Sequence, residues 1–420
     1  MSIKEKFVVT KRYNMISIAL MLLGILAIAG LYITTHGGKG TAEEKAVSDA
    51  RFWASLLQNS VYFLLVVNAS MFFICATTLA WGGWQMAFRR VPEAISAVVP
   101  VLGVISLAIL LAITFGENHT IFHWTDAEHV EHDKILNFKK GFLNKNFFAA
   151  MTVLTIAGWS LLGWKMRKLS RSLDDKPLAT VAERKKYIWN NTVWAALYIV
   201  VFALTVMSSI PWLWLMSIDA HWYSTMYSWY TFASTFVAGM SLIALFVVYL
   251  KNKGYLEYTN QEHVHDIGKF MFAFSVFWTY LWFSQFMLIW YANIPEETTY
   301  FKPRAYGVYG GMFWFMFMVN FIAPLLILMR RGSKRNYTIL TFMAVLIIFG
   351  HWLDLYQMVF PGPMTDAKTG ETHIPVILWD IAIALGFVGL IMYVTGKALS
   401  KAPLLAKNHP FVKESVIHHT

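Results

Sequence analysis

A histidine and a carboxylate, His351 and Asp354, lie within a long apolar segment near the end of the chain. Because the two residues are three positions apart, they share one face of a helix. An ionisable group in the hydrocarbon of a bilayer costs at least a few kcal/mol, so such groups usually face a protein interior and serve a function. A neutral imidazole beside a buried carboxyl group suits the deprotonation of a bound quinol or the conduction of protons. The alternative is a polar contact between helices that only fixes their packing.

Further polar residues accompany this pair. Asp380 lies in the next apolar segment, at a depth similar to that of Asp354 if both segments are helices. Together with Tyr356 and Gln357, the two carboxylates are predicted to form a polar cluster that accepts or relays protons. Burial favours the neutral form of a carboxyl group, which supports such a role.

Two other groups of residues lie in connections between apolar segments. Asp219 and His221 precede Trp222 in a connection without basic residues, where they either gate a pocket or form a polar turn beside an aromatic anchor. His119 and His123 have the i, i+4 spacing of some metal sites. No cysteine and no second matching pair fixes a ligand geometry there. A solvated face or a docking surface for a partner is therefore the preferred interpretation, and no metal is expected.

The composition indicates the class of protein. Of the 420 residues, 57% are hydrophobic and only 14% are charged, whereas a soluble chain carries roughly 25% charged residues. The sequence is therefore typical of a polytopic membrane protein. Its one cysteine, Cys75, cannot hold an iron–sulfur cluster, no Cys-x-x-Cys-His motif attaches haem c, and only His351 lies within an apolar segment. We expect the chain to bind no redox cofactor of these kinds itself.

The fold is expected to be all-α with ten transmembrane helices, because ten apolar runs are each long enough to span about 30 Å of hydrocarbon. These runs lie at 14–35, 53–80, 94–115, 146–164, 188–216, 229–250, 268–292, 308–329, 338–360 and 375–396. The net charge of +11 comes from lysines and arginines that gather in alternate connections. This asymmetry predicts that both termini are cytoplasmic and argues against nucleic-acid binding.

The ten segments divide into four parts. Residues 53–216 and 217–360 are each expected to form a four-helix bundle that begins at the outer face, so the two are candidates for a parallel repeat. Residues 1–52 supply a tail, the first helix and the first outer loop, and residues 361–420 supply the tenth helix and a cytoplasmic tail. Such a short terminal tail is expected to be only partly ordered.

Three sequence phrases, together with the one-plus-four-plus-four-plus-one order of helices, carry a resemblance to a known family. They are Lys140-Gly-Phe-Leu-Asn-Lys-Asn-Phe-Phe148, Asp219-Ala-His-Trp-Tyr-Ser-Thr-Met-Tyr-Ser-Trp229 and His351-Trp-Leu-Asp-Leu-Tyr356. Over nearly its whole length the chain resembles the polysulfide-reductase membrane-anchor (NrfD-type) superfamily. More narrowly, it is similar to the smaller of the two such subunits in bacterial alternative complex III, a quinol:cytochrome c oxidoreductase.

The resemblance implies an assembly in the bacterial inner membrane, which this chain would cross several times. Its partners would be a larger NrfD-type membrane subunit, an iron–sulfur protein, cytochrome c subunits and lipids, with a terminal oxidase as a further candidate. The iron–sulfur clusters and haem c would belong to those partners, and only a quinone is a candidate ligand of this chain. His351 and Asp354 become polar positions of the second bundle, and Asp219 and His221 lie where that bundle opens outward.

Two functions are therefore open. In the first, the chain is a membrane subunit of a respiratory quinol:cytochrome c oxidoreductase, where it supports quinol oxidation and forms a proton path. In the second, it is a secondary transporter with a proton-coupled site at His351 and Asp354. A third possibility is a scaffold that only completes a membrane core. It differs from the first function only if substitution of His351 and Asp354 leaves turnover unchanged. The resemblance favours the first function.

Overall fold

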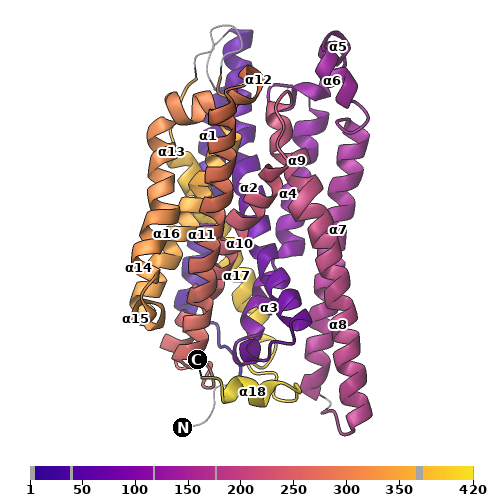
Figure 1. Ribbon diagram of the computed structural model, residues 1–420, viewed down its shortest axis with the longest axis vertical. Helices are drawn as coiled ribbons and strands as arrows, with labels where there is room; N and C mark the ends of the chain where they lie inside the picture. Colours follow the sequence, from indigo (N-terminus) through magenta and orange to yellow (C-terminus); the bar gives the residue numbers. More distant parts are fainter. Residues whose placement is uncertain (1–4, 38–40, 117–118, 176, 366–371, 420) are drawn as a thin grey trace.

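The computed structural model describes residues 5–37, 41–116, 119–175, 177–365 and 372–419 (Figure 1). Within these residues, ten helical segments are long and apolar enough to cross a membrane. The regular elements of the same residues are all helices, apart from one isolated bridge between Thr365 and Thr372. The protein is therefore an all-α polytopic membrane protein, as its composition predicts.

Each predicted apolar run overlaps one of the ten spans. In chain order the spans are α1 (Lys11–His36), α2 (Ala42–Leu79), α3 with α4 (Arg90–Ser96 and Val99–Phe115), α7 (Lys145–Asp175), α8 with α9 (Val181–Leu204 and Ile210–Trp214), α10 (Met226–Asn252), α11 (Gln261–Ala292), α13 with α14 (Gly310–Phe317 and Ala323–Leu328), α16 (Tyr337–Val359) and α17 (Leu378–Ser400). Several helices extend beyond the apolar run. The clearest case is α2, which begins at Ala42 rather than near residue 53.

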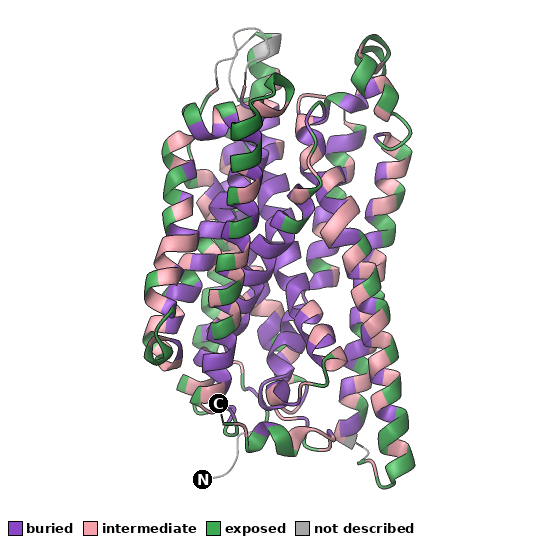
Figure 2. Ribbon diagram, viewed as in Figure 1, coloured by how far each residue is buried: buried purple, intermediate pink, exposed green. Residues whose placement is uncertain are grey.

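Eight spans form two closed rings of four. In the first bundle α2 packs against α4 and α8, and α7 completes the ring by packing against both of them. In the second bundle α10 packs against α11 and α16, and the interrupted span α13–α14 packs against both. The bundles meet where α2 packs against α10. In each of these two helices, 83% of the most apolar 18-residue stretch is buried, against 22–56% in the other spans. The two helices therefore form the centre of the molecule (Figure 2).

The two remaining spans, α1 and α17, pack closely against each other and against α2. Their axes approach where Gly24 faces Gly386, because a Cβ atom on Gly24 would lie only 2.5 Å from the Gly386 Cα. Small residues at such a crossing let two backbones come together, which is a common way to pair helices within a membrane. The flanking helices are therefore a pair on one side of the molecule.

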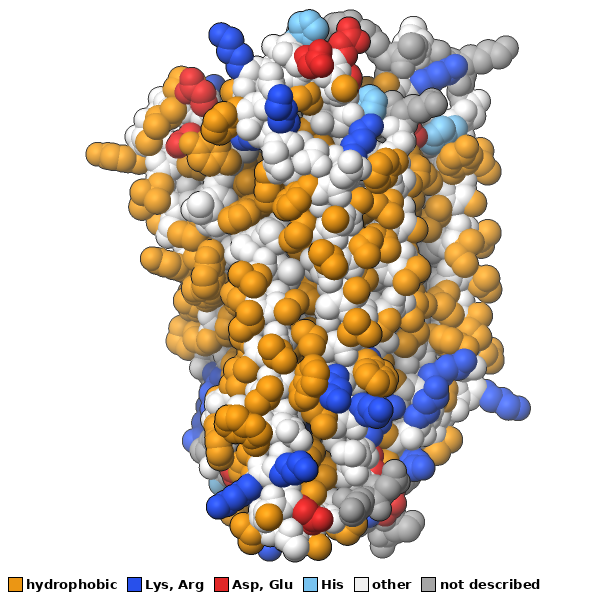
Figure 3. Space-filling view, turned by 90° about the vertical axis from the view of Figure 1, so that its right-hand side faces the viewer, with side chains coloured by type: hydrophobic (Ala, Val, Ile, Leu, Met, Phe, Trp, Pro, Cys, Tyr) orange, Lys and Arg blue, Asp and Glu red, His pale blue; other side chains and the backbone are white. Residues whose placement is uncertain are grey.

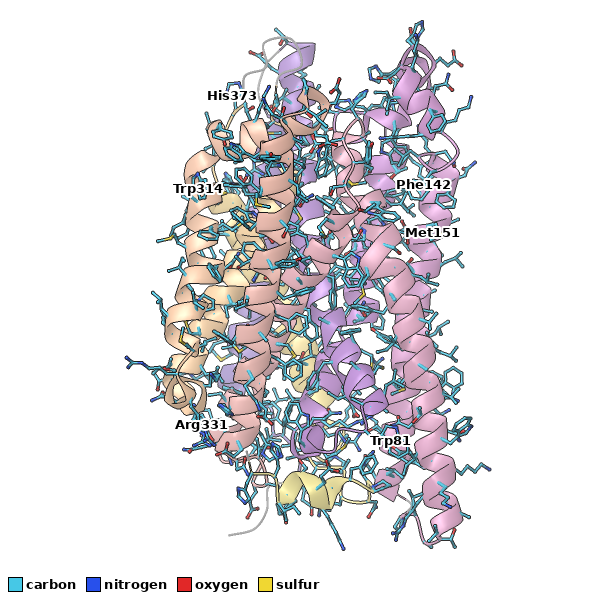
Figure 4. The ribbon with its side chains drawn as sticks, viewed as in Figure 1. Trp81, Phe142, Met151, Trp314, Arg331 and His373 are labelled. Atoms are coloured by element: carbon cyan, nitrogen blue, oxygen red, sulfur yellow. The ribbon has the colours of Figure 1, made fainter. Side chains whose placement is uncertain are left out.

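The ends of the spans define two faces of the molecule. We call the face near both chain termini the termini end, and the opposite face the loop end (Figure 1). The loop end carries α5 (Ala127–His132), α6 (Lys134–Lys139) and α12 (Pro295–Thr298), and the termini end carries α15 (Arg331–Arg335) and α18 (Val412–Val416). Arg331 and Trp81 lie toward the termini end and His373 toward the loop end (Figure 4). On the face shown in Figure 3, hydrophobic side chains cover most of the surface between the two ends, and many lysine and arginine side chains gather toward the termini end.

Two spans contain π-helical turns. The first, η3 (Thr205–Ser209), precedes Pro211, and the second, η6 (Met318–Ile322), precedes Pro324. A proline has no N–H group, so in a regular α-helix it leaves the carbonyl four residues earlier without a partner. The wider π turn accommodates this change, and such turns are often found at functional sites.

The chain after α17 is more ordered than expected. Asn408 donates a hydrogen bond to the Leu173 carbonyl of α7 at 2.6 Å, and His418 bonds to Asp266 of α11 at 2.7 Å. Ser415 lies between these anchors and is fully buried. The tail therefore runs beneath both bundles at the termini end, and the expectation of partial order is wrong for its described residues.

Candidate functional site

His351 and Asp354 lie in the middle of the second bundle. Their helix, α16, begins where the Asn336 side chain accepts hydrogen bonds from the N–H groups of Thr338 and Ile339. About 21 Å of helix rise separates its first residue from His351, which places the pair well inside the span. Both side chains are fully buried. The sequence prediction that both face a protein interior is consistent with this placement.

Asp354 accepts hydrogen bonds from three neutral donors. The Trp278 Nε1–H group of α11 lies 2.9 Å from Asp354 Oδ2, and the Ser234 hydroxyl of α10 lies 2.7 Å from the same oxygen. The Tyr230 hydroxyl of α10 donates to the other oxygen, Oδ1. No lysine or arginine of the described residues forms an ion pair with this carboxylate. Asp354 is thus held by dipoles from two neighbouring helices.

His351 is connected to Asp354 through a serine. The His351 Nδ1 atom lies 3.0 Å from the Ser234 Oγ atom and 3.7 Å from Asp354 Oδ2. With Asp354 ionised, the Ser234 hydroxyl donates to the carboxylate, and the imidazole Nδ1–H group then donates to Ser234 Oγ. The result is an ordered line of donors that runs from His351 through Ser234 to the carboxylate.

A second polar group, the Asn320 amide, lies against the residue that precedes His351. His351 Nε2 and both polar atoms of the Asn320 amide are buried and have no hydrogen-bond partner among the described residues. Asn320 lies in the π turn η6 and presses on Gly350, where a Cβ atom would come within 2.0 Å of its Oδ1 atom. Buried polar atoms of this kind usually meet an ordered water molecule. The turn thus gives the site a polar flank.

Aromatic side chains lead from the carboxylate toward the loop end, although the Tyr227 hydroxyl has no hydrogen-bond partner among the described residues. Tyr227 lies one helical turn before Tyr230 on α10, and its ring packs edge-on against Tyr300 with the centroids 6.3 Å apart. The Arg304 guanidinium lies over the Tyr300 ring at 3.6 Å and forms an ion pair with Asp219 at 2.8 Å. These residues connect the middle of the second bundle with its loop end.

The series of aromatic residues ends at a cavity of about 370 Å³, which we call the loop-end cavity. Asp219, Tyr300, Arg304 and His221 all contribute to its walls. Burial raises the pKa of Tyr300 to about 12, although Arg304 opposes the shift, so the phenol keeps its proton at neutral pH. Burial alone would lower the pKa of Arg304, but Tyr300 and Asp219 raise it above its usual value. The cavity therefore presents a permanent cation and neutral hydroxyl groups.

Asp219 and His221 line this cavity but have separate partners. Asp219 pairs with Arg304, whereas His221 Nε2 bonds to Asp133 of the α5–α6 connection at 2.5 Å. The His221 ring holds the pKa of Asp133 at about 2, so this carboxylate stays ionised. The connection therefore borders a cavity, which is compatible with both alternatives left open for it.

Asp380 belongs to a different network from Asp354. Its carboxylate forms a two-pronged ion pair with Arg51 of α2, at 2.6 and 3.0 Å, and accepts a hydrogen bond from Ser55 at 2.5 Å. Tyr356 lies toward this side, where its ring stacks on that of Phe360 at 3.9 Å. The predicted cluster is thus divided in two.

Gln357, the other predicted member of the cluster, is held by backbone contacts. Its side-chain amide donates to the Tyr309 backbone carbonyl at 3.2 Å, and the Gln357 backbone carbonyl accepts from Arg304 Nε at 2.8 Å. It therefore connects α16 with the residues of the loop-end cavity.

Three loop-end histidines lie around another cavity, of about 840 Å³. His119, His123 and His129 line it, together with Asp49 and Asp126. Among the described residues, no three histidine, cysteine or acidic side chains are grouped in a way that could hold a metal ion.

Several residues of the site were absent from the sequence prediction. Tyr230, Ser234 and Trp278, which bind the carboxylate, are ordinary members of apolar helices by composition alone. Arg51 and Arg304, the partners of the two other carboxylates, lie just outside the predicted apolar runs and resemble loop residues there. A signal was available on α10, where Tyr227, Tyr230 and Ser234 follow the i, i+3, i+7 spacing of one helix face.

Comparison with known proteins adds no relative. No model of a known protein family matches the sequence. No curated protein is found to be similar to the chain.

Proposed function

We propose that this chain is the membrane subunit, without a redox cofactor of its own, of a respiratory quinol:cytochrome c oxidoreductase in a bacterial inner membrane. The resemblance of three sequence phrases to NrfD-type anchors supports the class of assembly. In this assembly Asp354 and His351 accept and pass on protons that quinol oxidation releases. The larger NrfD-type subunit, the iron–sulfur protein and the cytochrome c subunits are the partners, and they hold the iron–sulfur clusters and haem c.

The observation that carries the proton role is the set of partners around Asp354. A carboxylate that is paired with a cation loses several kcal/mol when it is protonated, because the cation is left buried and uncompensated. Asp354 has only neutral donors, and two of them, the Tyr230 and Ser234 hydroxyl groups, can turn and accept a hydrogen bond when the carboxylate gains a proton. Asp380, locked to Arg51, lacks this freedom. Asp354 is therefore the carboxylate suited to change its protonation state.

The direction of the path follows from its surroundings. The Tyr230, Tyr227 and Tyr300 side chains lead from Asp354 to the loop-end cavity. The excess of lysine and arginine favours a cytoplasmic position for the termini end, by the positive-inside rule. With that orientation the cavity opens on the outer side of the membrane, and protons from quinol oxidation leave on that side. An outer loop end also suits docking of the cytochrome c subunits.

Asp354→Asn tests the proton role, since the substitution keeps the shape of the side chain and removes its acidity. We expect quinol turnover of the purified assembly to fall at least about tenfold, because a general acid–base group typically contributes 100-fold or more. Proton release is measured with a pH indicator in reconstituted vesicles. Glu296→Gln, which neutralises an exposed loop-end residue outside the network, serves as the control. Unchanged turnover and proton stoichiometry in an intact assembly would falsify the proton role, and loss of assembly would favour a packing role.

A secondary transporter is the second candidate function. The observation in its favour is the pair of interrupted spans, at η3 and at η6, because transporters bind substrates where membrane helices are broken. The η6 turn also borders His351 through Asn320 and Gly350. However, η3 lies in the fourth span of its bundle and η6 in the third, so the interruptions are not at matching positions.

A spectrum distinguishes the two functions. The chain is tagged, extracted in mild detergent and purified, and a reduced-minus-oxidised visible spectrum is recorded beside a gel. We expect a c-type haem band and several further subunits, which a chain without a haem attachment motif could acquire only from partners. A single colourless band after gentle extraction would instead support the transporter.

A further inference from the structure

A third cavity, of about 320 Å³, lies within the membrane-spanning part of the protein, between α2, α10, α16 and α17. Its lining consists entirely of hydrophobic residues, among them Phe63, Leu245, Phe349, Trp352, Ala384 and Val388. All of these residues belong to membrane-spanning segments. The cavity is separate from the loop-end cavity, which shares none of its lining residues.

The cavity is elongated along the helices. On α17 its lining extends from Ile381 to Met392, which corresponds to about 16 Å of helix rise. On α16 it extends from Val345 to Trp352, or about 10 Å. We call this cavity the apolar slot. Since the spans run across the bilayer, the long direction of the slot is also the direction of the hydrocarbon chains of the surrounding lipids.

The slot is open at the surface of the chain. Val345 and Leu385, on its rim, keep 55% and 37% of their surface exposed, while Phe63 at the inner wall is 3% exposed. The one polar group in its walls, the Trp352 indole N–H, is used in a hydrogen bond to Asn59 Oδ1 at 2.9 Å. An apolar cavity without polar partners does not hold water. An unfilled slot would also leave its walls without dispersion contacts.

We propose that the apolar slot binds one acyl chain of a phospholipid, which remains with the protein as a resident lipid. Its shape, depth and chemistry fit a saturated or unsaturated hydrocarbon chain. A quinone whose ring enters the slot is the weaker fit, because its carbonyl groups need hydrogen-bond donors and the lining offers none that is uncommitted. Ile381 and Trp352 lie toward the loop end, so the chain comes from the leaflet on that side. This inference holds for either function considered above.

Photo-crosslinking of the wild-type protein tests the proposal. The purified assembly is reconstituted in nanodiscs that contain phosphatidylcholine with a diazirine on one acyl chain, irradiated, digested and analysed by mass spectrometry. Peptides of α16 and α17 that contain Phe349, Leu385 and Val388 are expected to carry the lipid adduct at several times the yield of peptides from the exposed surface of α14. Equal labelling of all lipid-facing peptides would overturn the proposal.

A variant that fills the slot gives an independent readout. Ala384→Phe places a ring in the slot, while Leu326→Phe adds a similar ring on the exposed surface of α14, where Leu326 is 67% exposed. After extensive detergent washing, the wild type and Leu326→Phe are expected to retain about one more phospholipid per chain than Ala384→Phe. Equal phospholipid content in all three proteins, or a prenylquinone as the molecule that Ala384→Phe loses, would contradict the assignment.

Discussion

The two bundles use the same donors around different acceptors. In the first bundle the Tyr198 hydroxyl donates to Asn68 Oδ1 at 2.6 Å, and the Trp159 indole donates to Thr205 Oγ1 at 3.0 Å. In the second bundle a tyrosine and a tryptophan again point inward, but both donate to one carboxylate, Asp354. The first bundle shows that neutral acceptors are sufficient to join helices of this kind. The carboxylate of the second bundle is therefore not required for packing alone.

The contrast with Asp380 leads to the same conclusion. That residue lies between α2 and the flanking helix α17, where Arg51 neutralises it. When a buried carboxylate serves to join helices, pairing with a cation is the stable arrangement, since removal of either partner leaves an uncompensated charge. Asp354 departs from this arrangement. Its neutral surroundings favour a group that exchanges protons over one that only fixes a contact.

The largest effect is expected when a carboxylate is introduced into the first bundle. Asn68→Asp changes a fully buried amide into an acid that has Tyr198 as its only donor among the described residues. We expect the free energy of unfolding to fall by at least about 2 kcal/mol, the cost of burying a polar group with unsatisfied hydrogen bonds. The measurement is the thermal unfolding midpoint in detergent, with Asn68→Leu as the uncharged control of similar size.

A stable Asn68→Asp protein would contradict the difference inferred between the two bundles. If the unfolding midpoint matched that of the wild type, the interior of the first bundle would tolerate a carboxylate with one donor. The three donors around Asp354 would then no longer indicate a site built for an acid. If Asn68→Leu is destabilised as strongly as Asn68→Asp, the effect would not be specific to the acid, because leucine removes the acceptor of the Tyr198 hydrogen bond and aspartate keeps it.

The spans are well predicted by hydropathy, but their ends are not. An apolar run indicates which residues can lie in hydrocarbon, so each predicted run overlaps a span. The polar first turns of a helix carry no such signal, and α2 therefore begins at Ala42 rather than near residue 53. Arg51 falls in that missed stretch. By sequence it resembles a loop residue, and only its packing against Asp380 of a distant helix shows that it is buried.

The sequence predicts the ionisable residues of the candidate site but not the residues that bind them. His351 and Asp354 are conspicuous because ionisable groups are costly in hydrocarbon. Helix rise gives the depth of a residue but not the direction in which it points, so Asp354 and Asp380 were expected in one cluster and lie in two networks. Tyr230 and Trp278 gave little signal, because aromatic residues are common in every span.

A smaller effect is expected from removing one hydroxyl in each bundle. Tyr230→Phe deletes a donor to Asp354, and Tyr198→Phe deletes the matching donor to Asn68. Each substitution leaves a buried acceptor short of a partner, so both are expected to lower the free energy of unfolding by about 1–3 kcal/mol. Stability alone therefore does not separate the two bundles.

Quinol turnover of the assembly does separate them. Loss of the Tyr230 hydroxyl removes a donor from the carboxylate that is proposed to exchange protons, so turnover should fall. Tyr198→Phe should leave turnover unchanged, since Asn68 is the only side chain of the described residues to which the Tyr198 hydroxyl is bonded. Equal turnover in the two variants would mean that the bundles differ in composition only. A loss confined to Tyr230→Phe would assign the proton-exchanging group to the second bundle.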